Sequence, residues 1–385
     1  MAAGTSDDPT KPVHVLFVGA GAVGCFYASR LHHPSRNVYT SLTARSNYAA
    51  IATSGVTLQT RSFGDYTFTP YAVFPSVSAA VPNSPPPTSS SNPAPKDGWD
   101  YIIVTTKALP DRTDDAAMIA PLVSPKSCIV LIQNGVGVEE PYRRRFPRNP
   151  IVSAVTIVSA EQIRNGVIRQ NRWTRISLGP FTRGLNGTPA AGTARSGSSP
   201  SKCDGYSDDE EVVARRGREC MEDLARWWTQ LGGIRDVETH TELELQTIRW
   251  HKLCINAAFN PTAVLSGGRG NADQLTDPEL RAHVAAVMRE IWDAAPAVLG
   301  TPLPEGLATP DRIIRSTERN PGARPSMLLD WEAGRPMELE VILGNPVRIA
   351  RGAGVEMPRL QSLYALLRSM QEVREREQKA VKEKL

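Results

Sequence analysis

The feature that most constrains this chain is the stretch VHVLFVGAGAVGCFYA, residues 13–28. A run of strand-forming residues leads into Gly19, Gly21 and Gly24, and a second apolar run follows. In the pattern G-x-G-x-x-G the first glycine permits a tight turn, the second lets a pyrophosphate approach the backbone, and the third lets the helix pack close to the strand. The pattern therefore predicts a dinucleotide at the helix N-terminus, where backbone N–H groups are unpaired. We expect the cofactor to bind the backbone of Gly19, Gly21, Ala22, Val23 and Gly24.

Other interpretations of this stretch are weaker. A secretory signal needs a positively charged start, whereas MAAGTSDDPTKP carries two Asp and one Lys. The apolar stretch is broken by glycines and too short to cross a bilayer, and no apolar run elsewhere reaches ~18 residues. A glycine turn without a ligand stays open as an alternative. We expect a soluble, cytoplasmic protein without membrane contact.

The end of the next predicted strand, LTARS at residues 42–46, indicates which dinucleotide binds. An NAD site would place Asp or Glu there, about 20 residues past the glycines, to bind the ribose 2′-hydroxyl. This segment has no acid and carries Arg45. Because a guanidinium suits a 2′-phosphate, the sequence predicts NADPH or NADP as the cofactor. The alternative is an arginine on a loop without a ligand.

Composition limits the class of protein. The chain has 385 residues, which is ample for two domains. Its net charge of +4 is spread along the chain and does not suggest nucleic acid, and the basic run at 143–145 is typical of a solvated helix face. Five cysteines lie far apart without a C-x-x-C pair, which argues against a disulfide framework and against a zinc or other metal site.

The order of predicted elements indicates an α/β Rossmann-type doubly wound domain followed by a mostly α-helical domain. Strands are expected at 13–18, 37–44, 56–60, 66–74, 99–108, 127–137, 151–160, 166–170 and 175–181. We expect an NADP-binding domain over residues 1–182, with a disordered Pro/Ser-rich insertion at about 78–98. Residues 183–210 have low complexity and are a linker or an insertion. Residues 211–385 are expected to form the helical substrate and catalytic domain.

A polar stripe on one predicted helix is the strongest catalytic candidate. Lys252, Asn256 and Asn260 follow each other at i, i+4 and i+8, so they share one helix face among apolar neighbours. Such a stripe is costly unless its members are paired or face a pocket. Pro261 predicts a kink or a helix end at Asn260. A solvated surface stripe is the alternative.

Other polar residues are expected near this stripe. Lys107 and Asn134 each close a predicted strand, and ligands of open α/β sheets gather at the carboxyl ends of strands. Ser326 and Glu338 lie around a later predicted helix. Each of these residues alone is compatible with simple solvation.

Taken together, the segments resemble the ketopantoate reductase (2-dehydropantoate 2-reductase) family. The matching pieces, in the order of that family, are GAGAVG, VTTKA, LIQNGVG, WHKLCINAAFNPTAVL, PSMLLDWEAGRPMELEVILG and VEMPRLQSLYALL. The resemblance implies reduction of 2-dehydropantoate to pantoate by NADPH, for pantothenate and coenzyme A biosynthesis, in a cleft between the two domains. Two departures are the low-complexity insertions and Met337, where a small polar residue is common.

The resemblance also implies roles for the candidate residues. Lys252 would be the general acid, and Glu338 would bind the hydroxyl side of the substrate. The substrate would further contact Asn256, Asn260 and, through its carboxylate, Ser326. Lys107 and Asn134 would lie where nicotinamide and substrate meet.

Elementary chemistry agrees with a lysine in this role. Hydride transfer to a ketone leaves an alkoxide, which needs a proton and charge stabilisation. A lysine with a pKa of about 10.4 is charged at neutral pH and supplies both. Two other functions stay open, namely an NADPH-dependent reductase of another small 2-keto acid and a non-catalytic NADPH-binding sensor. The last predicted helix packs on its own domain or on a second copy, so a homodimer also stays open.

Overall fold

The computed structural model describes residues 11–86, 92–184 and 208–383 and divides the chain into two compact units. The first unit comprises residues 1–106, 114–133 and 139–245. The second comprises residues 107–113, 134–138 and 246–385. Two short segments that follow strands of the first unit, 107–113 and 134–138, thus belong to the second.

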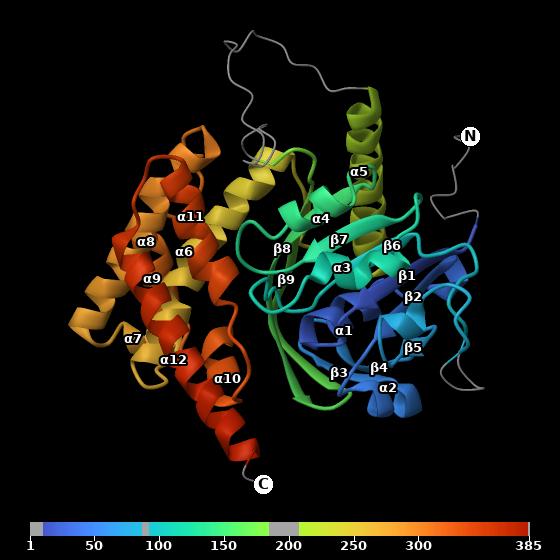
Figure 1. Ribbon diagram of the computed structural model, residues 1–385, viewed down its shortest axis with the longest axis horizontal. Coiled ribbons are helices and arrows are strands. Elements are labelled where there is room, and N and C mark those ends of the chain that lie inside the picture. The colour runs from blue at the N-terminus through green and yellow to red at the C-terminus, as the bar shows by residue number, and fades with distance from the viewer. Residues whose placement is uncertain (1–10, 87–91, 185–207, 384–385) are drawn as a thin grey trace. The chain divides into compact units, whose positions relative to one another are not determined.

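The first unit is built on one sheet whose described part has ten strands in the order β4-β3-β9-β8-β7-β6-β1-β2-β5, with β10 beside β9 (Figure 1). The neighbours from β5 through β2, β1, β6 and β7 to β8 are all parallel, whereas β8–β9 and β3–β4 are antiparallel. The strands are β1 (Val13–Val18), β2 (Val38–Thr43), β3 (Val56–Thr60), β4 (Gly64–Phe68), β5 (Val73–Phe74), β6 (Tyr101–Val104), β7 (Cys128–Ile132), β8 (Ile151–Arg164), β9 (Val167–Pro180) and β10 (Val237–Thr239). The predicted strands at 166–170 and 175–181 are one long strand, β9, paired with β8.

Helices cover both faces of this sheet, as β-branched strands buried on both sides require. The helices of the first unit are α1 (Ala22–Ser29), α2 (Tyr48–Ser54), α3 (Asp115–Ile119), α4 (Glu140–Arg145) and α5 (Asp208–Arg226). One core contains Phe17, Ile103 and Val130 of the sheet with residues of α1 and α5. The other contains Leu16 and Ile102 with residues of α3 and α4. The doubly wound α/β prediction is confirmed.

The expected disorder at 78–98 is wrong for the parts that the structure describes. Residues Ser78–Ala80 form a 3-10 turn, and Ala80 and Ala94 are fully or nearly fully buried. The indole N–H of buried Trp99 donates to the Ala80 carbonyl at 2.9 Å. The two alanines belong to the same apolar core as Trp99, so this Pro/Ser-rich stretch does bury apolar surface. Residues 87–91 lie outside the described part.

The boundary between the units differs from the expected division at 182 and 211. Residues 208–245 belong to the first unit, because Leu224, Trp227 and Trp228 at the end of α5 and in the following π-helical turn, Trp227–Leu231, are buried in its core. The helical character of a segment does not say which core the helix joins. The stretch 185–207 lies outside the described part.

The second unit is helical apart from its two strand-end segments (Figure 1). Its helices are α6 (Glu242–Leu265), whose first residues belong to the first unit, α7 (Asn271–Gln274), α8 (Pro278–Leu299), α9 (Pro310–Glu318), α10 (Ser326–Glu332), α11 (Asn345–Gly352) and α12 (Pro358–Lys382). Helix α8 packs against α9, α11 and α12. The apolar residues Leu360, Leu363 and Leu367 of α12 are buried within this unit. Helix α6 continues past Asn260 to Leu265 with Pro261 inside it, so the expected helix end is absent there.

Three further properties concern the described residues only. None of their helices is both long and apolar enough to traverse a lipid bilayer. They contain no cluster of His, Cys, Asp or Glu suited to a metal ion. Cys25, Cys128, Cys220 and Cys254 are free thiols, and Cys203 lies outside the described part.

Candidate active site

The three glycines of the turn in the first unit differ in the space that surrounds them. Gly19 has φ +114°, and a Cβ there would lie 3.0 Å from the Thr106 backbone nitrogen. A Cβ on Gly24 would lie 2.2 Å from the Gly19 carbonyl oxygen and 2.6 Å from the Thr105 hydroxyl oxygen. A Cβ on Gly21 would meet nothing within 4 Å. The first and third glycines are thus required by packing, whereas the second, the residue before the first turn of α1, borders open space that a phosphate can fill.

Arg45 follows the end of β2 and is held near this turn by its neighbours. The backbone N–H of Gly19 donates to the Thr43 hydroxyl at 3.2 Å, and the Asn47 side chain donates to the Ala20 carbonyl at 2.7 Å. Arg45 itself is exposed, and residues 41–48 contain no acid. The two contacts on either side hold the backbone of Arg45 near the glycine turn, and an exposed guanidinium from this position is compatible with a dinucleotide that carries a 2′-phosphate.

Two residues of this cradle escaped the sequence analysis. Thr105, at the end of β6, donates its hydroxyl to the Gly19 carbonyl at 2.7 Å and fills the space beside Gly24. Asn47 is buried and exchanges two hydrogen bonds with Gln162 of β8 at 2.8 and 3.0 Å. The available signal was their position, because Thr105 directly follows β6 and Asn47 lies four residues after β2, and the carboxyl ends of these strands meet at this edge.

In the second unit one amide joins the two strongest catalytic candidates. Lys252, on α6, donates from Nζ to Oδ1 of Asn134 at 2.8 Å. Nδ2 of the same amide donates to Oε2 of Glu338 at 3.3 Å. Asn134 lies on the segment that follows β7, and Glu338 lies on the loop before the π-helical turn Glu340–Gly344. Asn134 therefore connects Lys252, which is 118 positions away in the sequence, with Glu338, which is 204 positions away, in one hydrogen-bonded network.

The surroundings shift the protonation equilibria of both ends of this chain. Burial lowers the pKa of Lys252 to about 8, and the charge of nearby Arg249 acts in the same direction while that of Glu338 opposes it. Burial raises the pKa of Glu338 above its usual value, against the hydrogen bonds from Ala108 and Asn134. A lysine whose pKa lies near neutrality can both hold and release a proton under physiological conditions.

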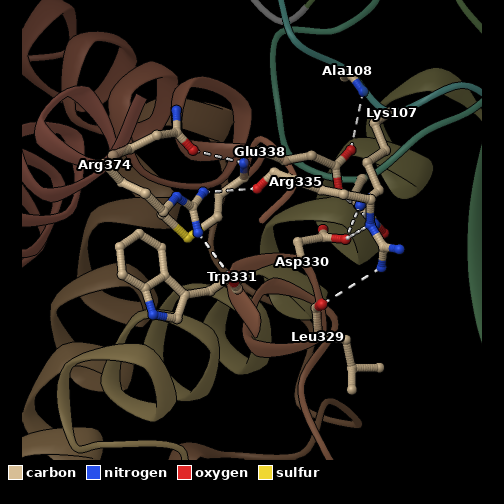
Figure 2. A network of polar contacts seen from close by, with 11 residues as sticks. Lys107, Ala108, Leu329, Asp330, Trp331, Arg335, Glu338 and Arg374 are labelled. Atoms are coloured by element: carbon tan, nitrogen blue, oxygen red, sulfur yellow. Dashed lines mark hydrogen bonds and ion pairs between the residues drawn. The ribbon is translucent and has the colours of Figure 1, made fainter. Parts of the chain in front are cut away.

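A second set of contacts ties Ala108 to the same carboxylate and its neighbour Lys107 to a different one (Figure 2). The backbone N–H of Ala108 donates to Oε1 of Glu338 at 3.0 Å. Lys107 forms an ion pair with Asp330 of α10, a side chain that is only 5% exposed. Arg335 also donates to Asp330, at 3.2 Å. The exposed Lys107 is thus held by a buried partner that the sequence analysis missed, although Asp330 shares a helix face with Ser326 four residues earlier.

Helix α12 supports the loop that carries Glu338. Gln371 accepts a hydrogen bond from the Met337 N–H at 2.8 Å and is itself buried. The guanidinium of Arg374 lies 3.9 Å over the Trp331 ring and donates to the carbonyls of Trp331 and Arg335 (Figure 2). These contacts fix the backbone that leads into Glu338, which limits the reorganisation of its carboxylate.

The remaining candidates do not join this network. Asn256 shares the helix face of Lys252 and is half-buried, and Ser326 is exposed at the start of α10. Asn260 is buried at 5% exposure, and its Nδ2 has no hydrogen-bond partner among the described residues. Leaving a buried N–H unsatisfied costs roughly 1–3 kcal/mol, so this amide is suited to receive a ligand acceptor atom.

Comparison with known proteins identifies the same family in both halves of the chain. The family model described as ketopantoate reductase PanE/ApbA matches residues 15–183, and that of its C-terminal domain matches residues 244–371. An uncharacterized protein of Saccharomyces cerevisiae is 27% identical over 376 residues, which cover 92% of each chain. The crystal structure of 2-dehydropantoate 2-reductase from Methylococcus capsulatus is 30% identical, with a TM-score of 0.70, and the match covers 94% of this chain and 98% of that one.

A more distant structure shares the fold alone. The ternary structure of D-mandelate dehydrogenase with NADH and anilino(oxo)acetate is 18% identical, with a TM-score of 0.66, and the match covers 94% of this chain and 100% of that one. The same fold thus occurs in a protein that is named for a different substrate and holds a cofactor without a 2′-phosphate, and the fold does not by itself select either one.

Proposed function

Because this chain belongs to the ketopantoate reductase family, a family of NAD(P)H-dependent oxidoreductases, we propose that it reduces 2-dehydropantoate to pantoate with NADPH, a step of pantothenate and coenzyme A biosynthesis. The observation that carries the proposal is the hydrogen-bonded chain from Lys252 through Asn134 to Glu338. It combines a proton donor with a lowered pKa and a buried carboxylate in one polar arrangement. A binding protein that only senses the dinucleotide does not need such a group.

Lys252 is the proposed general acid. Reduction of a 2-keto acid places negative charge on the former carbonyl oxygen, and a protonated amine both stabilises that charge and delivers the proton. With a pKa of about 8, Lys252 is mostly protonated at neutral pH and is a stronger acid than an ordinary lysine. Positioned acid catalysis of this kind is typically worth ~10²–10⁴-fold in rate.

Asn134 and Glu338 complete the polar arrangement. The amide of Asn134 is fixed with its oxygen toward Lys252 and its nitrogen toward Glu338. Glu338 has acceptor capacity beyond its bonds from Ala108 and Asn134, which suits the substrate hydroxyl. The other candidates, Asn256, Asn260 and Ser326, take no part in this network. We assign the substrate carboxylate and carbonyl to these three side chains.

The cofactor assignment rests on the first unit. Gly19, Gly21 and Gly24, with the N–H groups of Ala22 and Val23, would hold the pyrophosphate, and Arg45 would hold the 2′-phosphate. NADPH supplies the hydride when it is bound. Lys107, paired with Asp330, is assigned to the nicotinamide side of the site together with Asn134.

A panel assay tests the proposal. Purified protein is incubated with NADPH and 2-dehydropantoate, and NADPH oxidation and pantoate formation are followed by absorbance and mass spectrometry. The panel also contains other branched 2-keto acids and an aromatic 2-oxo acid, because the distant neighbour is named for D-mandelate. Pantoate formation with the highest kcat/KM of the panel supports the proposal. A higher value for another keto acid assigns that substrate instead, and NADPH binding without turnover on any compound assigns a sensor.

A further inference from the structure

A pair of cysteines lies between the sheet and α5, outside the groups that the proposed reaction uses. Cys128 opens β7 directly opposite Tyr101, the first residue of the neighbouring strand β6. Cys220 lies on α5, one turn before Asp223, and the Tyr101 hydroxyl donates to Oδ2 of Asp223 at 3.3 Å. The face of α5 that carries Cys220 therefore covers the sheet where Tyr101 and Cys128 are paired.

The two thiols lie in the same apolar core, because Cys128 is one of its buried members and Cys220 packs against it from α5. Each thiol influences the pKa of the other, and the Tyr101 hydroxyl also acts on Cys220. Their accessibility differs, because Cys128 is fully buried whereas Cys220 is partly exposed. A small oxidant from solvent therefore meets Cys220 first, and the buried thiol is already at its side.

The surroundings also shift the pKa values of the two thiols in opposite directions. The Cys128 thiol and the Tyr101 hydroxyl lower the pKa of Cys220 against the effects of burial and of Asp223, and Arg216 one turn earlier acts in the same direction as the first two. Burial and the neighbouring Cys220 raise the pKa of Cys128. Reactive cysteines have accessible sulfur with a lowered pKa, so Cys220 has the character of the attacking thiol and Cys128 that of the second partner.

We propose that Cys220 and Cys128 form a peroxide-sensitive dithiol that closes to an intramolecular disulfide between α5 and β7. The Cys220 thiolate attacks one oxygen of hydrogen peroxide, the O–O bond breaks, and Cys220 sulfenic acid and hydroxide form; the hydroxide becomes water by taking up the proton that the thiol had released. The Cys128 sulfur then attacks the Cys220 sulfur, the S–O bond breaks, and a second water leaves. The two sulfurs lose two electrons together, and the peroxide gains them.

Thiol mapping of the full-length protein tests this modification site. The protein is treated with hydrogen peroxide, remaining thiols are alkylated, and peptides are identified by mass spectrometry without and with dithiothreitol. We expect a dithiothreitol-sensitive link between the peptides of Cys128 and Cys220, with Cys25 and Cys254, which are buried, alkylated only after denaturation. Cys203→Ser is the matched control and leaves the link unchanged.

Two variants separate the steps. In Cys128→Ala the sulfenic acid of Cys220 has no partner, so dimedone labels Cys220 and longer exposure yields its sulfinic acid. In Tyr101→Phe the hydroxyl that lowers the pKa of Cys220 is lost, which slows the labelling, while the melting temperature reports whether the sheet is intact. A Cys220 thiol that survives peroxide, or a link from Cys220 to Cys203 or to a second chain, overturns the proposal. These readouts involve no keto acid, so they are independent of the reductase assay.

Discussion

The side-chain oxygen of Asn134 lies 2.8 Å from the Lys252 ammonium nitrogen and accepts its hydrogen bond. Since the amide nitrogen donates to Glu338, the orientation of the amide is set from both sides. Lys252 therefore has a fixed direction, although its aliphatic stem alone would leave several rotamers open. The consequences of this contact can be measured in the rate, in its pH dependence and in the behaviour of the supporting residues.

Replacement of Lys252 by alanine should remove the proton donor without changing the fold. We expect kcat for keto acid reduction to fall by ~10²–10⁴-fold, because positioned acid catalysis contributes about that much. NADPH binding should stay within about twofold, since the glycine turn and Arg45 belong to the first unit. Steady-state kinetics and fluorescence titration of NADPH measure the two quantities. Lys379→Ala, an exposed lysine of α12, is the control, and near-normal kcat in Lys252→Ala would remove Lys252 from its role.

The pH dependence of the forward reaction should reflect the lowered pKa of Lys252. Burial brings this pKa to about 8, and only the protonated amine can donate, so kcat should decline above about pH 8. The reverse reaction needs the neutral amine and should rise through the same range. Lys252→Arg should lose the decline, because a guanidinium stays protonated. A decline that begins near pH 10 in the parent enzyme would mean that burial does not act on this group.

The sequence predicted the elements that local patterns encode. The glycine spacing after VHVLFV, the strand-rich runs and the helix face of Lys252 and Asn256 all depend on neighbours within a few residues. The structure has β1, α1 and α6 where these patterns predict them. The pairing of Asn134 with Lys252 spans 118 residues, and no local pattern could reveal that contact.

The errors have a common physical cause. Asp330, Asn47 and Thr105 act through long-range contacts, so as isolated polar residues they carry no distinguishing signal. Residues 211–226 of α5 were assigned to the helical domain because amphipathicity shows that a helix buries a face but not against which partner. Both kinds of information arise only when distant segments pack.

Replacement of Arg45 by alanine should separate the two nicotinamide cofactors. A hydrogen bond to a charged group contributes roughly 1.5–3 kcal/mol, which corresponds to about tenfold or more in KM for NADPH. The KM for NADH should change little, because NADH lacks the 2′-phosphate. Parallel kinetics with both cofactors measure the ratio, and Arg36→Ala, an arginine just before β2, is the control. Equal losses with NADPH and NADH would contradict the assignment of Arg45.

The glycines of the turn should respond differently to the same substitution. In Gly24→Ala the new Cβ meets a backbone oxygen at 2.2 Å, so the first unit should lose about 1–3 kcal/mol of unfolding free energy or fail to fold. Gly21→Ala has φ −84° and free space around the Cβ, so it should fold normally. Its methyl group would nevertheless occupy the approach of the pyrophosphate, and NADPH affinity should fall. Denaturant titration and NADPH titration of both variants distinguish packing from binding, and normal NADPH affinity in Gly21→Ala would argue against a pyrophosphate at this turn.

Replacement of Asp330 by asparagine should shift the acidic limb of the pH–rate profile. We expect this limb to reflect the protonation of Glu338, the carboxylate that we assign to the substrate hydroxyl. Burial chiefly raises the pKa of Glu338, and the negative charge of Asp330 adds to that rise, so removing the charge should lower the pKa and move the limb to lower pH. The fold should survive, because the partners left behind, Lys107 and Arg335, have side chains 40% and 57% exposed and remain solvated. Arg335→Met keeps the Asp330 charge and its pair with Lys107, so its limb should not move to lower pH. An unchanged limb in Asp330→Asn, with melting temperatures equal to the parent, would show that Asp330 does not act on Glu338 and serves only to hold Lys107.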